Sequence, residues 1–400
     1  MTTNECDVLI SGGGIAGLSA AILFGRAGFD VICVDPVAPV TAPDEPGADL
    51  RTTAILQPAQ ALLDRAGIWS RLGGAPAPLH IMRIVEAKAA SGQAPLTRDF
   101  AASDISDQPF GWNVPNWLLR REMMAHIASH DNVAFHPGTA VTSLFTRETE
   151  ARVTLSNDRK VRTRLVVAAD GRDSLVREKS GIAVTRLRYG QKALSFAVTH
   201  DAPHQNISTE IHRSGGPFTL VPLPDHEGRP CSAIVWMEAG PEVQRLANLP
   251  VGAFEAEMTE RSGEIYGPLT LASPLSVWPI VSQLAERMWA QRVALIAEAA
   301  HVVPPIGAQG LNMSLKDLHV LTDLAKADPE SIGTAKMLRA YHNSRYPDVQ
   351  LRVRGIDALN RASQAGSAPL SDLRAMGLNA LFAVPPVRRG LMQMGLGAGN

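Results

Sequence analysis

Residues 7–17 read DVLISGGGIAG, and this stretch decides the fold. The apolar run 7–11 is typical of a short buried strand, and residues 15–27 have the spacing of a helix that ends with Gly28 in the C′ position. Residues 30–34 predict a second strand. A strand, a glycine turn, a helix and a second strand in this order predict a βαβ unit.

The glycine turn has the spacing GxGxxG between the strand and the helix. The first glycine permits a tight turn, the second lets the backbone approach a pyrophosphate, and the third allows close packing of helix on strand. An acidic residue at the end of the second strand is placed to accept hydrogen bonds from ribose hydroxyls. We expect a dinucleotide to contact Gly12, Gly14, Ile15, Ala16, Gly17 and Asp35. This spacing does not choose between NAD and FAD.

Length and composition restrict the class of protein. The 400 residues exceed one ordinary domain, and 45% hydrophobic with 19% charged residues excludes a disordered chain. The net charge of −1 argues against a nucleic-acid binder. Three widely spaced cysteines without a CxxC pattern support neither a disulfide framework nor a zinc site, and we expect no metal. We find no secretion signal and no apolar run of membrane-spanning length, so we expect a cytoplasmic protein.

The rest of the chain predicts an α/β fold with a second sheet. Apolar segments between turns at residues 79–86, 193–199, 218–223 and 232–237 predict mainly antiparallel strands. Helices are expected at residues 58–66, 118–129, 251–261, 314–327 and 334–353. We predict a discontinuous Rossmann-like domain (1–72, 112–180 and 285–345), a substrate domain with the second sheet (73–111 and 181–284), and a C-terminal helical segment (346–400).

Two further stretches repeat the pattern of a buried strand that ends in a carboxylate. Residues 165–177 read LVVAADGRDSLVR, with Asp170 at the strand end, and residues 293–312 read VALIAEAAHVVPPIGAQGLN, with Glu298. The second stretch continues through a Pro/Gly-rich loop into a helix start, whose N–H groups favour negative charge in the loop. His301 in this stretch is more often a loop or core residue than a base.

These three motifs, in this order, resemble the flavin-dependent aromatic hydroxylases with the p-hydroxybenzoate hydroxylase fold. The similarity covers essentially the whole chain and is nearest to the ubiquinone-biosynthesis hydroxylases, given the stretch RTTA at 51–54, the pair Trp278 and Pro279, and the loop PPIGAQGLN at 304–312. The family usually reads Gly-Asp-Ala-Ala-His where this chain has AEAAH at 297–301. Asn116 stands where the family often has Arg or Gln.

The resemblance implies FAD as the cofactor and NAD(P)H as the co-substrate. It implies that the glycine turn binds the FAD pyrophosphate, that Arg51 lies on the pyrophosphate side, that Asp170 serves both nucleotides, and that Glu298 contacts the ribityl chain. Residues implied beside the flavin ring are Pro305, Gln309, Gly310, Leu311 and Asn312, with His301 nearby and Asn116 as a further contact. The sequence does not distinguish NADH from NADPH.

The implied reaction is hydroxylation of an aromatic ring through a flavin C4a-hydroperoxide, with a hydrophobic polyprenyl phenol or quinone precursor of ubiquinone biosynthesis as substrate. Two alternatives stay open: a flavin oxidoreductase of this fold that does not insert oxygen, and a non-catalytic FAD-binding subunit of a quinone-biosynthesis assembly. The apolar stretch 378–397 suggests a packed terminal helix or a peripheral contact with the inner membrane or a partner complex.

The residue types of several side chains on the second sheet suggest where they lie. Phe196, Phe218, Leu220 and Trp236 are possible linings of a substrate site, although aromatic residues on strands more often pack in the core. We expect His80, His200, His212 and Arg213 at the solvated surface.

Overall fold

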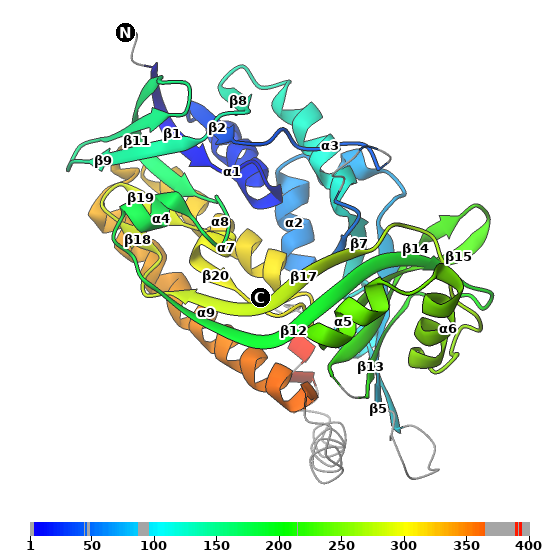
Figure 1. Ribbon diagram of the computed structural model, residues 1–400. Helices are drawn as coiled ribbons and strands as arrows, with labels where there is room; N and C mark the ends of the chain where they lie inside the picture. Colours follow the sequence, from blue (N-terminus) through cyan, green and yellow to red (C-terminus); the bar gives the residue numbers. More distant parts are fainter. Residues whose placement is uncertain are drawn as a thin grey trace.

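The computed structural model describes residues 4–43, 45, 49–86, 96–213, 215–364, 389–390 and 392–393. Figure 1 shows two sheets side by side, with helices between and around them. No helix among these residues is long and apolar enough to cross a membrane.

The first sheet carries the βαβ unit and is called the parallel sheet. Its central order is β19-β11-β1-β2-β8, in which every neighbouring pair is parallel. Antiparallel strands β18, β10 and β9 extend it. Its strands are β1 (Asn4–Ser11), β2 (Val31–Asp35), β8 (Val133–Pro137), β9 (Val141–Thr146), β10 (Ala151–Leu155), β11 (Lys160–Ala168), β18 (Trp289–Ala290) and β19 (Val293–Leu295).

The second sheet, called the antiparallel sheet, has the order β20-β17-β12-β15-β14-β13-β5-β6, and β16 pairs with β12. Among the strand pairs of this sheet in the described residues, only β5 with β13 is parallel, so the expectation of a mainly antiparallel sheet is confirmed. Its strands are β5 (Ile81–Glu86), β6 (Leu96–Ala101), β12 (Val184–Thr199), β13 (Ile207–His212), β14 (Pro217–His226), β15 (Arg229–Ala239), β16 (Thr270–Leu271), β17 (Ser276–Ala285) and β20 (His301–Val302). A small sheet of β3 (Thr52–Leu56), β7 (Gly111–Pro115) and β4 (Ala77–Leu79) lies between the two.

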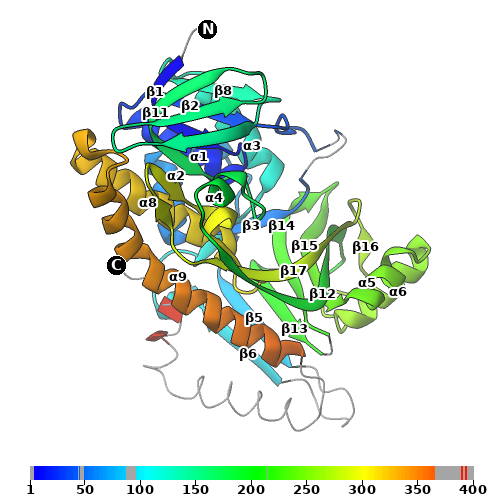
Figure 2. The same cartoon turned by 60° about the vertical axis from the view of Figure 1, so that its left-hand side comes forward.

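The helices cover the sheets from several sides. They are α1 (Ile15–Arg26), α2 (Gln57–Arg65), α3 (Asn116–Ile127), α4 (Leu175–Lys179), α5 (Gly240–Ala247), α6 (Val251–Arg261), α7 (Ala297–Ala300), α8 (Gln309–Ala327) and α9 (Ala335–Gln364). Figure 2 shows α9 running along the outside of the molecule past both sheets. It contacts β18 of the parallel sheet and β17 of the antiparallel sheet.

Helix α1 is buried nearly all round, because it lies under the parallel sheet and against α3 and α8. Its one polar side chain in the core, Ser19, donates to the carbonyl of Ile15 at 2.7 Å and is therefore satisfied. Gly28 follows the helix with φ +88°, a conformation that glycine adopts without strain. The local sequence therefore determines both ends of this helix.

Several expected boundaries differ from the structure. Helix α8 begins at Gln309, five residues before the expected start, because the turn before it uses left-handed residues rather than a side-chain cap. Helix α9 continues to Gln364 and contains Pro347, where a stop after residue 353 was expected. The domain limits given above stay a prediction. Most of the stretch 378–397 lies outside the described residues.

Two histidines contradict the expectation of surface positions. His200 is fully buried, with Nδ1 2.8 Å from the carbonyl of Ala202 and Nε2 2.9 Å from the Ser232 hydroxyl. The side chain of His212 is only 12% exposed and lies beside Glu210. The ring of His200 stacks on Tyr266, and the strand of His212 is paired with β5 and β14 on its two sides, so residue type alone misplaced both histidines. His80 is exposed, as expected.

Candidate active site

The glycine turn joins β1 to α1 and is packed on all sides but one. A Cβ on Gly12 would lie 2.2 Å from the carbonyl oxygen of Ala169, and one on Gly17 would lie 1.8 Å from that of Gly12. A Cβ on Gly14 would meet nothing within 4 Å. Gly14 is also the N-cap of α1 and makes no side-chain cap, so the free N–H groups of the helix start lie beside open space.

Asp35 closes β2 and holds this turn. Its Oδ2 accepts from the Gly13 N–H at 2.6 Å, and its Oδ1 accepts from the Val37 N–H at 2.8 Å. Each carboxylate oxygen has two lone pairs, so acceptor capacity remains for a ribose hydroxyl.

A cluster of charged side chains follows at the start of β3 and α3. Arg51 donates to both oxygens of Asp49, at 2.7 and 2.8 Å, and its guanidinium lies 5.4 Å from the ring centroid of Trp278. Asn116 donates to Asp49 Oδ2 at 3.0 Å, and Arg120 lies 3.2 Å from the same oxygen. Burial opposes ionisation of Asp49, but the hydrogen bonds and charges of the two arginines outweigh it, so the pKa of Asp49 is lowered.

The sequence indicated only part of this cluster. Arg51 and Asn116 were expected, and the structure places them on one carboxylate, Asp49, which was missed together with Arg120. Nε of Arg120 is buried and has no hydrogen-bond partner among the residues that the structure describes. The sequence contained only a weak signal for Arg120: it follows Asn116 by four residues, and residues at this spacing lie on the same face of a helix.

The later carboxylate Glu298 lies in the short helix α7, with its side chain 54% exposed and 4.0 Å from Arg172 Nε. Its neighbour Ala297 has φ +53°, a left-handed conformation that disfavours a residue with a Cβ. The backbone here therefore keeps the shape that suits glycine, although the chain has alanine. The hydrogen bond to Asp49 raises the pKa of Arg51, and the charge of the Glu298 carboxylate also raises it, so Glu298 and Arg51 lie within electrostatic range of each other.

The carboxylate of Asp170 accepts hydrogen bonds mainly from residues of the turn that follows it. Its Oδ1 accepts from the Ser174 hydroxyl and its Oδ2 accepts from the Val176 N–H at 3.2 Å, which fixes the start of α4. Burial raises the pKa of this carboxyl group. The structure therefore shows a positioning role for Asp170, and its contact with either nucleotide stays a prediction.

The loop from His301 to Asn312 is held at both ends. His301 is buried with its Nε2 2.7 Å from Asp317 Oδ2, and Asp317 Oδ1 accepts from Arg345 Nε at 2.8 Å. At the other end, Gln309 Oε1 accepts from Arg352 Nη1 at 2.7 Å. Both arginines also contact Asp348, so one network on α8 and α9 fixes the two ends of the loop.

Asn312 ties this loop to the small sheet. Its Nδ2 donates to the carbonyl of Ala54 at 2.7 Å, and its Oδ1 accepts from the Leu56 N–H at 2.9 Å, so the side chain replaces a neighbouring strand along β3. Pro305 and Gly310 are exposed, Leu311 is partly buried, and a Cβ on Gly310 would meet no atom within 4 Å. Open space therefore lies beside the helix start of α8 as it does beside Gly14.

The antiparallel sheet presents one face to this loop. Ala193, Met237 and Ile280 of the sheet pack with Ile306 of the loop and Ile356 of α9. The aromatic residues considered as substrate linings lie on the opposite face: Phe196, Phe218, Leu220 and Trp236 pack against α5 and α6. These four side chains therefore pack in the core, as expected for aromatic residues on strands. The small and aliphatic residues that alternate with them form the face toward the loop.

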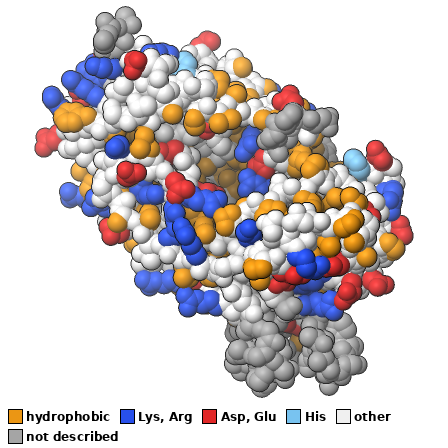
Figure 3. Space-filling model, viewed as in Figure 1, with side chains coloured by type: hydrophobic (Ala, Val, Ile, Leu, Met, Phe, Trp, Pro, Cys, Tyr) orange, Lys and Arg blue, Asp and Glu red, His pale blue; other side chains and the backbone are white. Residues whose placement is uncertain are grey.

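The open spaces beside Gly14 and Gly310 suit an elongated, partly anionic cofactor. The first turns of α1 and α8 contain no acidic residue and no side-chain cap, and within the described part of the chain the buried Arg120 Nε makes no hydrogen bond. Figure 3 shows the surface hollowed between the two sheet-bearing parts of the molecule, with charged side chains at the rim. The residues present therefore fit a dinucleotide with an extended linker.

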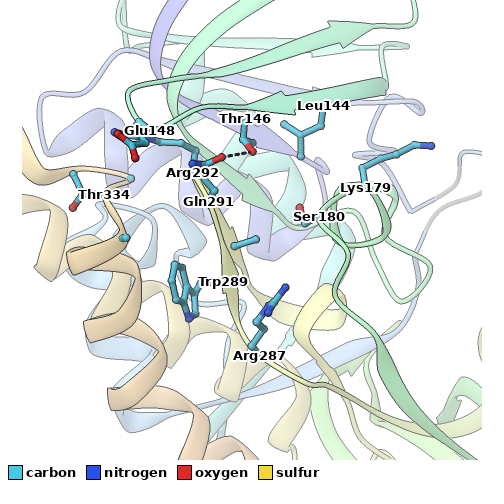
Figure 4. Close-up of a pocket in the computed structure, with 13 residues that line it drawn as sticks. Leu144, Thr146, Glu148, Lys179, Ser180, Arg287, Trp289, Gln291, Arg292 and Thr334 are labelled. Atoms are coloured by element: carbon cyan, nitrogen blue, oxygen red, sulfur yellow. Dashed lines mark hydrogen bonds between the residues drawn. The ribbon is translucent and has the colours of Figure 1, made fainter.

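A separate pocket of about 660 Å³ lies at the edge of the parallel sheet. Figure 4 shows Arg287 and Trp289 on one side of it and the hydrogen bond from Thr146 to Gln291 on the other. This pocket lies at the Arg292 end of β19, whereas Glu298 follows the opposite end of that strand. It contains none of the predicted site residues.

Comparison with known families agrees with this geometry. The model of the FAD binding domain family matches residues 5–355. The chain belongs to this family. Ubiquinone hydroxylase UbiL of Rhodospirillum rubrum is 33% identical over 400 residues, which cover 98% of this chain and 89% of that protein. Ubiquinone hydroxylase UbiM of Neisseria meningitidis is 25% identical over 390 residues, covering 96% and 83%.

Solved structures confirm the fold of this FAD-binding family member. PqsL, a probable FAD-dependent monooxygenase from Pseudomonas aeruginosa, superimposes with a TM-score of 0.76 at 25% identity and covers 92% of this chain and 100% of its own. The expectations of an FAD-dependent monooxygenase and of the α/β fold with a second sheet are thereby confirmed. The role of each site residue stays a prediction.

Proposed function

We propose that this FAD-dependent monooxygenase hydroxylates a hydrophobic aromatic precursor of ubiquinone, a phenol with a polyprenyl chain. The observation that carries the proposal is the arrangement around the hollow, where a dinucleotide turn and the start of α8 lie beside open space and an apolar sheet face lies behind the loop. The names of the relatives support the pathway, since they are ubiquinone hydroxylases.

FAD, when bound, supplies the oxygen-activating chemistry with electrons from NAD(P)H. The glycine turn and α1 bind its pyrophosphate through free N–H groups. Asp35 accepts from the ribose, and Glu298 accepts from the linker that joins nucleotide to ring. Arg51 and Arg120 share the single carboxylate of Asp49 and so leave net positive charge, which would attract the phosphates of the cofactor.

The loop from His301 to Asn312 orients the ring of the cofactor, and the apolar face behind it excludes water. Ala193, Met237 and Ile306 are buried against one another and carry no hydrogen-bonding side chain, so the surroundings of the loop are apolar and favour an aromatic ring over a polar ligand. Charge that develops near the start of α8 is stabilised by its N–H groups, because no acidic residue opposes them. Peripheral association with a membrane or a quinone-biosynthesis complex belongs to the proposal as a way to collect an insoluble substrate.

The test measures cofactor and product together. Heat-released cofactor from the purified protein is expected to run as FAD, and NAD(P)H oxidation with a prenylated phenol is expected to consume oxygen and yield a product with one more oxygen atom. A strain that lacks the gene is expected to accumulate a quinone precursor one hydroxyl group short. Reduction of the substrate without oxygen uptake would favour the oxidoreductase alternative, and FAD without any turnover would favour the non-catalytic subunit.

A further inference from the structure

One side chain of the antiparallel sheet reaches the charged cluster on Asp49. Trp278 lies on β17 and packs with Ala193 of β12 and with Ile306 of the loop from His301 to Asn312. The guanidinium carbon of Arg51, the residue before β3, lies over the indole ring, 5.4 Å from its centroid. Trp278 therefore joins the sheet face toward the loop to the arginine that we place beside the cofactor phosphates.

The backbone around Trp278 fixes where its ring lies. Pro279 follows it, and a residue before proline is restricted to extended conformations. In the register of the sheet, Trp278 is directly opposite Ala193, whose side chain is small. The ring is half-buried and is held by the strand pair β12 and β17. Trp278 can therefore position Arg51, because its own position does not depend on the arginine.

Two sides of the Arg51 guanidinium are occupied. Its Nε and Nη2 donate to the two oxygens of Asp49, at 2.7 and 2.8 Å, and Asn116 and Arg120 fix the same carboxylate. Two such hydrogen bonds still allow the guanidinium plane to hinge about the line through the carboxylate oxygens, and the ring of Trp278 blocks this motion on one side. The carboxylate and the ring together decide the direction of the remaining donors.

The remaining nitrogen of Arg51 is available to a ligand. Nη1 makes no hydrogen bond to any residue that the structure describes, and the Arg51 side chain is 45% exposed. A guanidinium edge donates well to phosphate oxygens, and a donor that is already oriented loses less entropy on binding than one that is free to turn. The contact with Trp278 therefore favours binding of an anionic group at Nη1.

We propose that Trp278 is a positioning residue for the cofactor, which holds the Arg51 guanidinium so that Nη1 donates to a phosphate oxygen of FAD. The antiparallel sheet thereby helps to retain FAD, although the dinucleotide turn belongs to the parallel sheet. The proposal rests on the placement of Arg51 beside the phosphates in the proposed function, and it adds the residue that holds Arg51 there.

The test measures FAD affinity of the full chain by fluorescence titration, together with the rate of FAD release. Trp278→Leu is expected to weaken FAD binding about two- to fivefold, mainly through faster release, as loss of one cation–π contact allows. Trp278→Tyr keeps an aromatic face and should retain most of the affinity. The matched control is Trp289→Leu, because Trp289 is a half-buried tryptophan that lies 5.5 Å from the guanidinium of Arg339 and away from the predicted site; it should bind FAD as wild type does.

A double-mutant cycle separates positioning of Arg51 from damage to the fold. Arg51→Gln is expected to weaken FAD binding about tenfold. Adding Trp278→Leu to Arg51→Gln should cause no further loss, because the effect of Trp278 passes through the guanidinium. If Trp278→Leu does not fold, Trp278→Met replaces it in the same cycle, since the flexible methionine fills the space without a ring.

Additive losses in the cycle would overturn the proposal, because they would show that Trp278 supports the fold and not Arg51. Wild-type affinity in Trp278→Leu, or an equal loss in Trp289→Leu, would overturn it as well. Wild-type affinity in Arg51→Gln would overturn both this proposal and the placement of Arg51 beside the phosphates. Hydroxylation enters none of these measurements, so a protein that binds FAD but hydroxylates no substrate would contradict the proposed function alone.

Discussion

Gly14 and Gly17 of the glycine turn differ in the space around them, so the same substitution is expected to affect the protein differently at each. Gly14→Ala adds a methyl group that meets no protein atom within 4 Å, whereas Gly17→Ala places one 1.8 Å from the carbonyl oxygen of Gly12. We expect Gly14→Ala to fold normally and to bind FAD weakly. We expect Gly17→Ala to damage the fold itself, because Gly12 is already packed against Ala169.

The magnitudes follow from these contacts. In Gly17→Ala the two atoms must separate by about 1.6 Å to reach the ordinary contact of 3.4 Å, and overpacking of this kind costs about 1–3 kcal/mol. In Gly14→Ala, loss of chain entropy in the unfolded state stabilises by about 0.4–1 kcal/mol and the poorer N-cap offsets it. Displaced phosphate contacts weaken FAD binding by about ten- to a hundredfold.

Two measurements test this reasoning: the free energy of unfolding of the FAD-free proteins in denaturant, and FAD affinity by fluorescence titration. Wild-type FAD affinity in Gly14→Ala would refute the placement of the pyrophosphate beside Gly14. Equal destabilisation of the two FAD-free variants would refute the difference in packing on which the prediction rests.

Three further predictions concern the later motif and its network. Ala297→Gly is expected to raise the free energy of unfolding by up to about 1 kcal/mol, because glycine adopts the φ of +53° at this position without strain. The matched control Ala299→Gly, in the ordinary helical part of α7, is expected to lower the free energy of unfolding by about 1 kcal/mol. Denaturant titration of the two variants checks this. Burial opposes ionisation of Asp348, but its arginine partners lower its pKa below the usual 3.8, so the stability it contributes is complete above that pH and is lost as pH falls through the lowered value. The difference in unfolding free energy between wild type and Asp348→Asn should therefore be constant near neutral pH and shrink below about pH 4 in acid denaturation. Arg352→Ala removes the hydrogen bond to Gln309 Oε1, so the flavin absorbance band should shift and FAD affinity fall by up to about tenfold, with partial recovery in Arg352→Lys. Unchanged spectra in both variants would show that the network does not position the loop.

The predictions from sequence succeeded where the signal is local. The glycine turn, α1 and the two flanking strands depend on residues within about thirty positions, and φ preferences and periodicity act at that range. The same holds for α6, which matches its expected limits. The start of α8 was missed because Ala308 takes a left-handed conformation that alanine rarely adopts, so no cap residue marks the helix start.

The sequence by itself therefore determined the βαβ unit with its glycine turn and the presence of a second sheet, because each is encoded by neighbouring residues. Only the tertiary structure decided which side chains share a face or a charge. The strand that carries His212 lies between β5 and β14, the second of which follows it directly while the first lies more than a hundred residues earlier. Asp49 likewise forms ion pairs with Arg51 and with Arg120, and Arg120 lies far from Asp49 along the chain. Burial and pairing depend on partners that are distant along the chain, and periodicity in one segment contains no information about them.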